Sequence, residues 1–114
     1  MRKRLGIVGH SDEGLALIPL LEANPDVELC GVLSDDPDAA RAALVRVDPK
    51  YALRSYQLLV SDAQAFLRTP GLVALIDAEA PATFRSVLES APERGVQVTT
   101  PLIAKLLYAF GPVD

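Results

Sequence analysis

The chain has 114 residues, a formal charge of −4 and 50% hydrophobic residues. This length suits one compact domain and is too short for a nucleotide-binding domain together with a separate substrate domain. Its basic residues are dispersed apart from residues 2–4, so nucleic acid, which binds clusters of cations, is not an expected partner. No apolar run approaches the ~20 residues that cross a bilayer, and no signal-peptide core follows the basic start, so we expect a cytoplasmic protein without membrane insertion.

Short hydrophobic runs alternate with segments of helical periodicity, which is the pattern of βαβ units around a parallel sheet. The clearest runs are apolar without alternation, as in strands buried on both faces. The expected strands cover residues 5–8, 27–33, 72–77 and 96–99, with a weaker one near residues 56–60.

Helical periodicity and capping residues mark the segments between these runs. The expected helices cover residues 14–23, 38–45, 81–91 and 102–110, and a shorter helix runs from the caps at 61–62 to residue 67. Pro19 should kink or shorten the first helix because it lacks a backbone donor. Thr100 and Pro101 suit the start of the last helix, whereas residues 46–57 are expected to be mostly loop. The elements together predict an α/β domain of three layers, in which helices cover both faces of an open parallel sheet of about five strands.

The turn at residues 9–14 follows the first expected strand and opens the first expected helix. Its sequence, Gly-His-Ser-Asp-Glu-Gly, matches the dinucleotide-binding pattern G-x-G-x-x-G at the first and third glycines. In that pattern backbone amides and the helix N-terminus hold a pyrophosphate. The predicted ligand-binding residues of the turn are Gly9, His10, Ser11, Asp12, Glu13 and Gly14.

Two features of this turn leave a second interpretation open. Ser11 stands where the middle glycine belongs, and Asp12 and Glu13 would repel a phosphate while they stabilise the helix dipole. The glycines would then only shape the turn and the carboxylates would only cap the helix. A nucleotide, a different small ligand and no ligand at all remain alternatives for the turn.

An acid about 20 residues beyond the turn would hold the ribose hydroxyls of a dinucleotide. Ser34 or Asp35 occupies that position, and a solvated turn acid is the alternative. Because Asp36 and Asp38 would repel a 2′-phosphate, the sequence favours NAD over NADP.

The end of the fourth expected strand completes the predicted cofactor-binding set with Ala78 and Glu79. Open α/β sheets bind ligands at such strand ends. Asp77 and Glu79 are also a conceivable acid–base pair, although catalysis is not expected there. His10 is the single histidine, so no metal cluster of histidines is expected. The lone Cys30 is expected to be a buried structural thiol.

Residues 6–100 resemble the nucleotide-binding domain of the Gfo/Idh/MocA-family oxidoreductases, a Rossmann-type domain. The resemblance rests on residues 6–9 leading into Gly14 and on segments 20–29, 35–40, 70–78 and 93–98. It implies NAD as the cofactor. The family's catalytic lysine lies in a Glu-Lys-Pro segment, and residues 99–101 of this chain are Thr-Thr-Pro. Without that lysine the usual proton-handling group is missing, so no catalytic residue is expected; Lys105 is expected at the surface.

The tail at residues 96–110 is similar to that of Rossmann-type modules at the N-terminus of some bacterial sensor histidine kinases. The resemblance implies that residues 1–114 form one ligand-binding domain of a larger protein, joined to a PAS or kinase domain through the last helix. That helix has more apolar residues than one face requires. The expected roles of this surplus are pairing with a second copy, continuation into another domain, or core packing. Its members are Leu102, Ile103, Leu106, Leu107 and Phe110.

These observations favour a non-catalytic regulatory domain of a bacterial signalling protein that senses a ligand, with NAD(H) as the best single choice. One alternative is the cofactor-binding part of an NAD-dependent oxidoreductase without its substrate domain. Another is a structural dimerisation module with an inactive ligand site.

Overall fold

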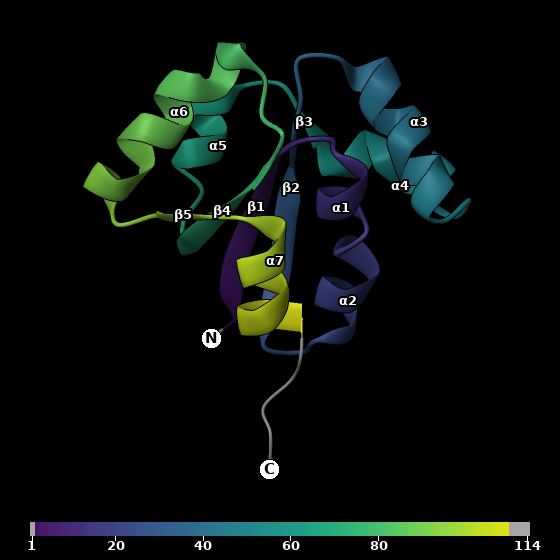
Figure 1. Cartoon of the computed structure of the whole chain (residues 1–114), viewed down its shortest axis with the longest axis horizontal. Helices are drawn as coiled ribbons and strands as arrows, with labels where there is room; N and C mark the ends of the chain where they lie inside the picture. Colours follow the sequence, from purple (N-terminus) through teal and green to yellow (C-terminus); the bar gives the residue numbers. More distant parts are fainter. Residues whose placement is uncertain (1, 110–114) are drawn as a thin grey trace.

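A five-stranded, all-parallel sheet with the strand order β3-β2-β1-β4-β5 forms the centre of the computed structural model (Figure 1). The structure describes residues 2–109, apart from the side chains of residues 54–57. The strands are β1 (Lys3–Gly9), β2 (Val27–Leu33), β3 (Leu59–Val60), β4 (Leu72–Ala78) and β5 (Gln97–Thr99). The predicted three-layer α/β architecture is confirmed.

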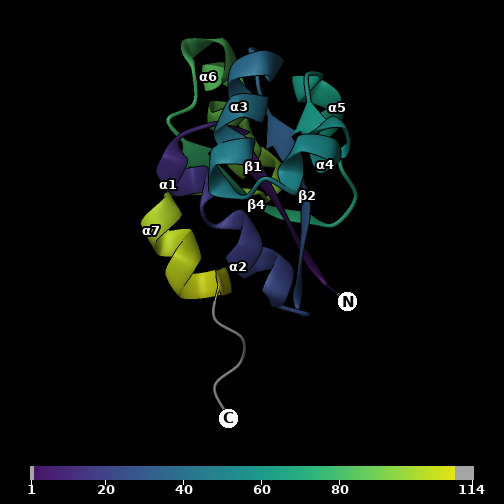
Figure 2. The ribbon, with the colours of Figure 1, turned by 90° about the vertical axis from the view of Figure 1, so that its right-hand side faces the viewer.

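Helices cover both faces of the sheet (Figures 1 and 2). One face carries α1 (Asp12–Leu15), α2 (Ile18–Ala23), α3 (Pro37–Val47), α4 (Tyr51–Leu58) and α7 (Pro101–Ala104). The other face carries α5 (Ala63–Leu67) and α6 (Arg85–Ser90), with the 3₁₀ turns η1 (Ala82–Phe84) and η2 (Ala91–Arg94) on either side of α6. The helix expected over residues 81–91 is therefore α6 with a 3₁₀ turn at each end.

The first helix begins at the glycine turn, two residues earlier than expected. Ser11 caps α1, since its Oγ accepts a hydrogen bond from the amide of Gly14 at 3.2 Å. The helix breaks after Leu15, and α2 starts with Pro19 in its first turn. Proline cannot donate to the carbonyl four residues earlier, and the prediction that Pro19 shortens the helix is confirmed.

The expectation that residues 46–57 form mostly loop is wrong. The α3 helix continues to Val47, α4 spans Tyr51–Leu58, and β3 is only two residues long where a strand over 56–60 was expected. The pattern of α4 was hard to recognise because Tyr51 and Leu58, one full heptad apart, are buried while Leu53 is 83% exposed.

The C-terminal segment packs beside α2 on the first face of the sheet (Figure 2). Thr100 caps α7 as expected, because its Oγ1 accepts a hydrogen bond from the amide of Ile103 at 3.3 Å. The chain continues as the π-helical turn η3 (Lys105–Ala109), and the predicted helical residue Phe110 lies outside the described residues. Within the described part of the chain, no helix has both the length and the hydrophobicity for a transmembrane span.

Candidate functional site

The carboxyl ends of three neighbouring strands meet at one edge of the sheet. Val8 of β1 pairs with Leu33 of β2, and Gly9 of β1 pairs with Ala78 of β4. The chain runs from β1 outward to β2 and β3, and then returns to form β4 and β5 on the other side of β1. The β1–β4 boundary is therefore the topological switch point, where open α/β sheets bind ligands.

Both glycines of the turn allow close packing against β4. Gly9 has φ +98, and a Cβ there would lie 2.3 Å from the carbonyl oxygen of Ala78. A Cβ on Gly14 would lie 2.3 Å from the Cβ of Ala78. The amide of Ser11 donates to the carbonyl of Ala78 at 3.1 Å. Ala78 is thus the surface on which the turn rests, and Gly14 brings helix and strand together as the third glycine of the dinucleotide pattern does.

Three polar groups of the turn have no hydrogen-bond partner among the described residues. The amides of Asp12 and Glu13 are the first two of α1, and the Ser11 side chain satisfies only the third, that of Gly14. Nδ1 of His10 is buried and unpaired within residues 2–109. Asp12 and Glu13 are exposed residues, so their amides can donate to a ligand. The His10 nitrogen is enclosed and lacks the hydrogen bond that buried polar groups normally have.

A hollow of about 290 Å³ adjoins the turn, and four carboxylates line it. It is formed by Ser11, Asp12, Glu13, Asp77, Glu79 and Pro101. Two of the carboxylates already have partners. Asp77 accepts a hydrogen bond from the amide of Ala80 at 2.9 Å, and Asp12 pairs with Arg46 at 3.2 Å. The hollow favours groups that carry positive charge and disfavours unshielded phosphates.

The structure distinguishes the two candidates for ribose recognition at the end of β2. Ser34 is only 2% exposed, and its Oγ accepts a hydrogen bond from the amide of Asp36 at 3.0 Å. Asp36 caps α3 by accepting from the amide of Ala39. Asp35 is exposed and accepts a hydrogen bond from Oγ1 of Thr83 at 3.2 Å. Asp35 is therefore the candidate with an accessible carboxylate.

Sequence analysis missed two residues that contact the predicted site, Thr83 beside Asp35 and Arg46 beside Asp12. Thr83 follows β4 and Arg46 lies near the end of α3, so each contact joins residues far apart in the chain. No local pattern indicates such a contact; only the strand order brings these segments together.

The threonines at the position of the resembling family's lysine have structural roles. Thr99 is 4% exposed at the end of β5, and Oγ1 of Thr100 caps α7. Lys105 is exposed, as expected, and lines a different groove, between α7 and the α1–α2 segment. The position that the resemblance assigns to a lysine is thus occupied by two threonines, one buried and one capping a helix.

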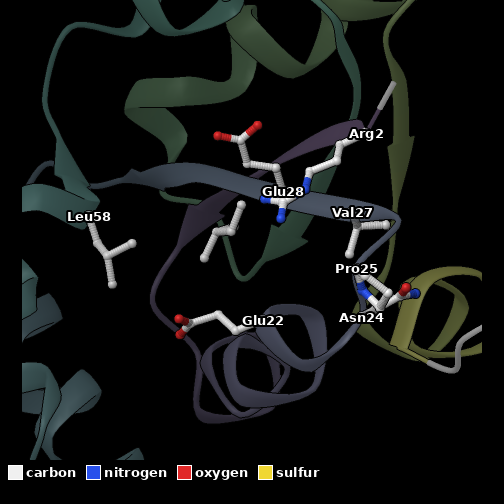
Figure 3. Close-up of a pocket in the computed structure, with 8 residues that line it drawn as sticks. Arg2, Glu22, Asn24, Pro25, Val27, Glu28 and Leu58 are labelled. Atoms are coloured by element: carbon white, nitrogen blue, oxygen red, sulfur yellow. The ribbon is translucent and has the colours of Figure 1, made fainter.

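A second hollow of about 290 Å³ lies at the opposite edge of the sheet, where β1 and β2 begin (Figure 3). Glu22 from α2, Glu28 from β2 and Leu58 from α4 surround it. The carboxylate of Glu22 accepts a hydrogen bond from the hydroxyl of Tyr51 at 2.6 Å. This hollow lies at the amino ends of the strands, and the ligand sites of open α/β sheets lie at the carboxyl ends.

Cys30 of β2 is half-buried, which corrects the expectation of a buried thiol. The short β3 pairs only with Val32 and Leu33, so this part of β2 forms an open edge. Burial raises the pKa of the Cys30 thiol. Two charges make smaller contributions: Arg4 lowers the pKa and Glu28 raises it. Because the thiolate is the reactive form, we expect iodoacetamide to alkylate Cys30 several-fold more slowly at neutral pH in the folded chain than in urea. Equal rates in the two conditions would contradict this.

Comparison with known proteins identifies the fold. No protein-family model matches the chain, and no curated protein sequence matches it. Among solved structures it is similar to the N-terminal part of yvaA from Bacillus subtilis, which is assigned as an oxidoreductase. The TM-score is 0.57 and the identity 15%, over 87% of this chain and 26% of that one. The fold is Rossmann-like. The chain spans about a quarter of the yvaA protein, and the similarity between the two is one of fold.

Proposed function

We propose that this chain is a non-catalytic regulatory domain that binds NAD(H) at the carboxyl edge of β1. The proposal rests on one observation, that the exposed amides of Asp12 and Glu13 at the carboxyl end of β1 have no hydrogen-bond partner within residues 2–109. Backbone amides at a turn between strand and helix are suited to the oxygens of a pyrophosphate. The absence of a lysine equivalent at Thr99 and Thr100 argues that binding is not followed by a reaction.

Charges around the site favour one form of the ligand. Asp35, accessible at the end of β2, suits ribose hydroxyls and would repel a 2′-phosphate, so we expect NAD to bind more tightly than NADP. The nicotinamide ring of NAD⁺ is cationic and that of NADH is neutral. Asp77 and Glu79 line the hollow, so the oxidised form is expected to bind more tightly. A domain with this preference would report the oxidation state of the nicotinamide pool to an attached signalling domain.

Calorimetric titration of the chain with NAD⁺ tests the proposal, and a pair of variants locates the site. Asp12→Pro removes the first amide hydrogen of α1 at a helix position that accepts proline, after Ser11, whose ψ of 150 suits a residue before proline. A lost hydrogen bond to a charged oxygen is expected to weaken NAD⁺ binding about 10- to 100-fold. Asp12→Ala is the matched control, since it removes the same carboxylate and keeps the amide; it is expected to bind NAD⁺ as tightly as the original chain, or more tightly.

The four carboxylates of the hollow favour a second candidate function, a structural module whose ligand site is inactive. Their combined charge opposes the phosphates of any nucleotide, and Arg46 neutralises only one of them. The same titration separates the two functions. Saturable binding of NAD⁺ that Asp12→Pro weakens supports the sensor, whereas no heat of binding at millimolar NAD⁺ supports the structural module and refutes the sensor.

A further inference from the structure

The α7–η3 segment has apolar side chains on two opposite sides. Ala104 and Tyr108 pack into the core beside α2. On the outer side, Leu102 is 69% exposed, Leu106 66%, Leu107 55% and Ile103 46%. These four residues form the outer face of the α7–η3 segment. A helix that is apolar on all sides is ordinarily buried, and soluble domains seldom expose contiguous large aliphatic groups without an interaction to cover them.

This segment is held firmly on the domain. The side-chain amide of Asn24, itself 6% exposed, donates to the carbonyl of Tyr108 at 2.7 Å. The Thr100 hydroxyl caps the other end of the segment. Because Ala104 and Tyr108 already occupy the inner side, the segment cannot rotate to bury its outer face without exposing them. The outer face is thus a fixed surface of the domain.

An apolar groove of about 430 Å³ runs beside the outer face, between the α7–η3 segment and the α1–α2 segment. Leu17, Leu20 and Leu102 contribute apolar walls, and Glu13 and Lys105 contribute opposite charges. No ion pair joins Glu13 to Lys105 among the residues that the structure describes. The four residues of the outer face therefore form an apolar ridge next to the groove, and the groove is lined by one acid, Glu13, and one base, Lys105.

We propose that this surface binds a second copy of the same chain in a two-fold symmetric dimer. A two-fold interface joins one patch to itself, so the patch must be self-complementary in shape and charge. Here the leucine ridge of each copy fills the groove of the other, and Glu13 of each copy lies beside Lys105 of the other. A partner protein with a single charge sign would satisfy only one of these two groups. The groove and the NAD(H) hollow share Glu13, but the dimer requires no bound ligand and the ligand requires no dimer, so each proposal can fail alone.

Sedimentation velocity of the 114-residue chain tests the dimer from about 1 μM to about 1 mM. We expect a species of twice 12.2 kDa that dissociates on dilution. Leu106→Glu places a charge on the outer face at an exposed position and is expected to raise the dimer dissociation constant at least ~100-fold, because a desolvated unpaired charge is costly. The matched control is Leu53→Glu on α4, where the leucine is 83% exposed; it should leave the dissociation constant unchanged. Circular dichroism shows whether both variants keep the fold.

A charge exchange tests the two-fold arrangement independently. Glu13→Lys alone and Lys105→Glu alone are each expected to weaken the dimer several-fold at low salt, and the double exchange to restore it. Three results would overturn the proposal: a chain that stays monomeric at ~1 mM, equal weakening by Leu53→Glu and Leu106→Glu, or a double exchange no stronger than the single ones. A monomeric chain would leave the face to a different partner.

Discussion

Replacing Gly9 by alanine is expected to lower the free energy of unfolding by about 3 kcal/mol. A residue other than glycine pays about 1 kcal/mol in the left-handed region that Gly9 occupies at φ +98. The added Cβ would also meet the Ala78 carbonyl at 2.3 Å, and forcing a group into a packed site costs about 1–3 kcal/mol. Urea denaturation followed by circular dichroism measures the change.

Gly95→Ala is the matched control for this substitution. Gly95 has φ +76, and a Cβ there would meet nothing within 4 Å. Gly95→Ala should therefore lower the free energy of unfolding only by the backbone cost of this conformation, about 1 kcal/mol. Equal destabilisation by the two variants would mean that the contact between the turn and β4 does not constrain Gly9.

Replacing Asn24 by alanine is expected to lower the free energy of unfolding by about 2 kcal/mol. The carbonyl of Tyr108 would lose its donor in a buried place, which costs about 1–3 kcal/mol. The substitution also removes the acceptor for the amide of Asp26, which the Asn24 side chain binds at 2.9 Å. Urea denaturation measures the loss, and hydrogen exchange should show faster opening of residues 104–109.

Asn24→Asp separates the two bonds of this side chain. The aspartate keeps an oxygen for the amide of Asp26 and places its other oxygen against the Tyr108 carbonyl, in the position of the lost donor. We expect it to destabilise the chain at neutral pH at least as much as alanine. Wild-type stability of Asn24→Asp would show that the bond to Tyr108 does not hold the C-terminal segment.

The strands could be predicted from the sequence more reliably than the helices. A strand buried on both faces, such as β4 with Leu75 and Ile76 fully buried, is an uninterrupted apolar run whatever its neighbours are. The α4 helix is short, and of its described side chains Tyr51 and Leu58 are buried while Leu53 is exposed. The helix packs on α3, which directly precedes it in the chain, and on β2, and its apolar periodicity is weak.

The position of the predicted site could be recognised from the sequence, but only part of its negative charge could. The glycine spacing indicated the turn, and the structure shows why both glycines are needed, since each packs on Ala78. That Asp77 and Glu79 would join Asp12 and Glu13 around one hollow follows from the pairing of β1 with β4. A local pattern contains no information about such pairing. The repulsion of phosphate by Asp12 and Glu13 could be predicted from the sequence, whereas the addition of Asp77 and Glu79 to the same hollow is visible only in the structure.

The amide resonances of the ¹⁵N-labelled chain, followed during titration with NAD⁺, test the central claim most directly. If the ligand binds at the turn between β1 and α1, the amides of His10, Asp12 and Glu13 should shift and saturate together. Those around the amino-edge hollow, such as Asn24 and Glu28, should stay in place. Unchanged signals at Asp12 and Glu13 in millimolar NAD⁺, or shifts confined to the amino edge, would contradict the account.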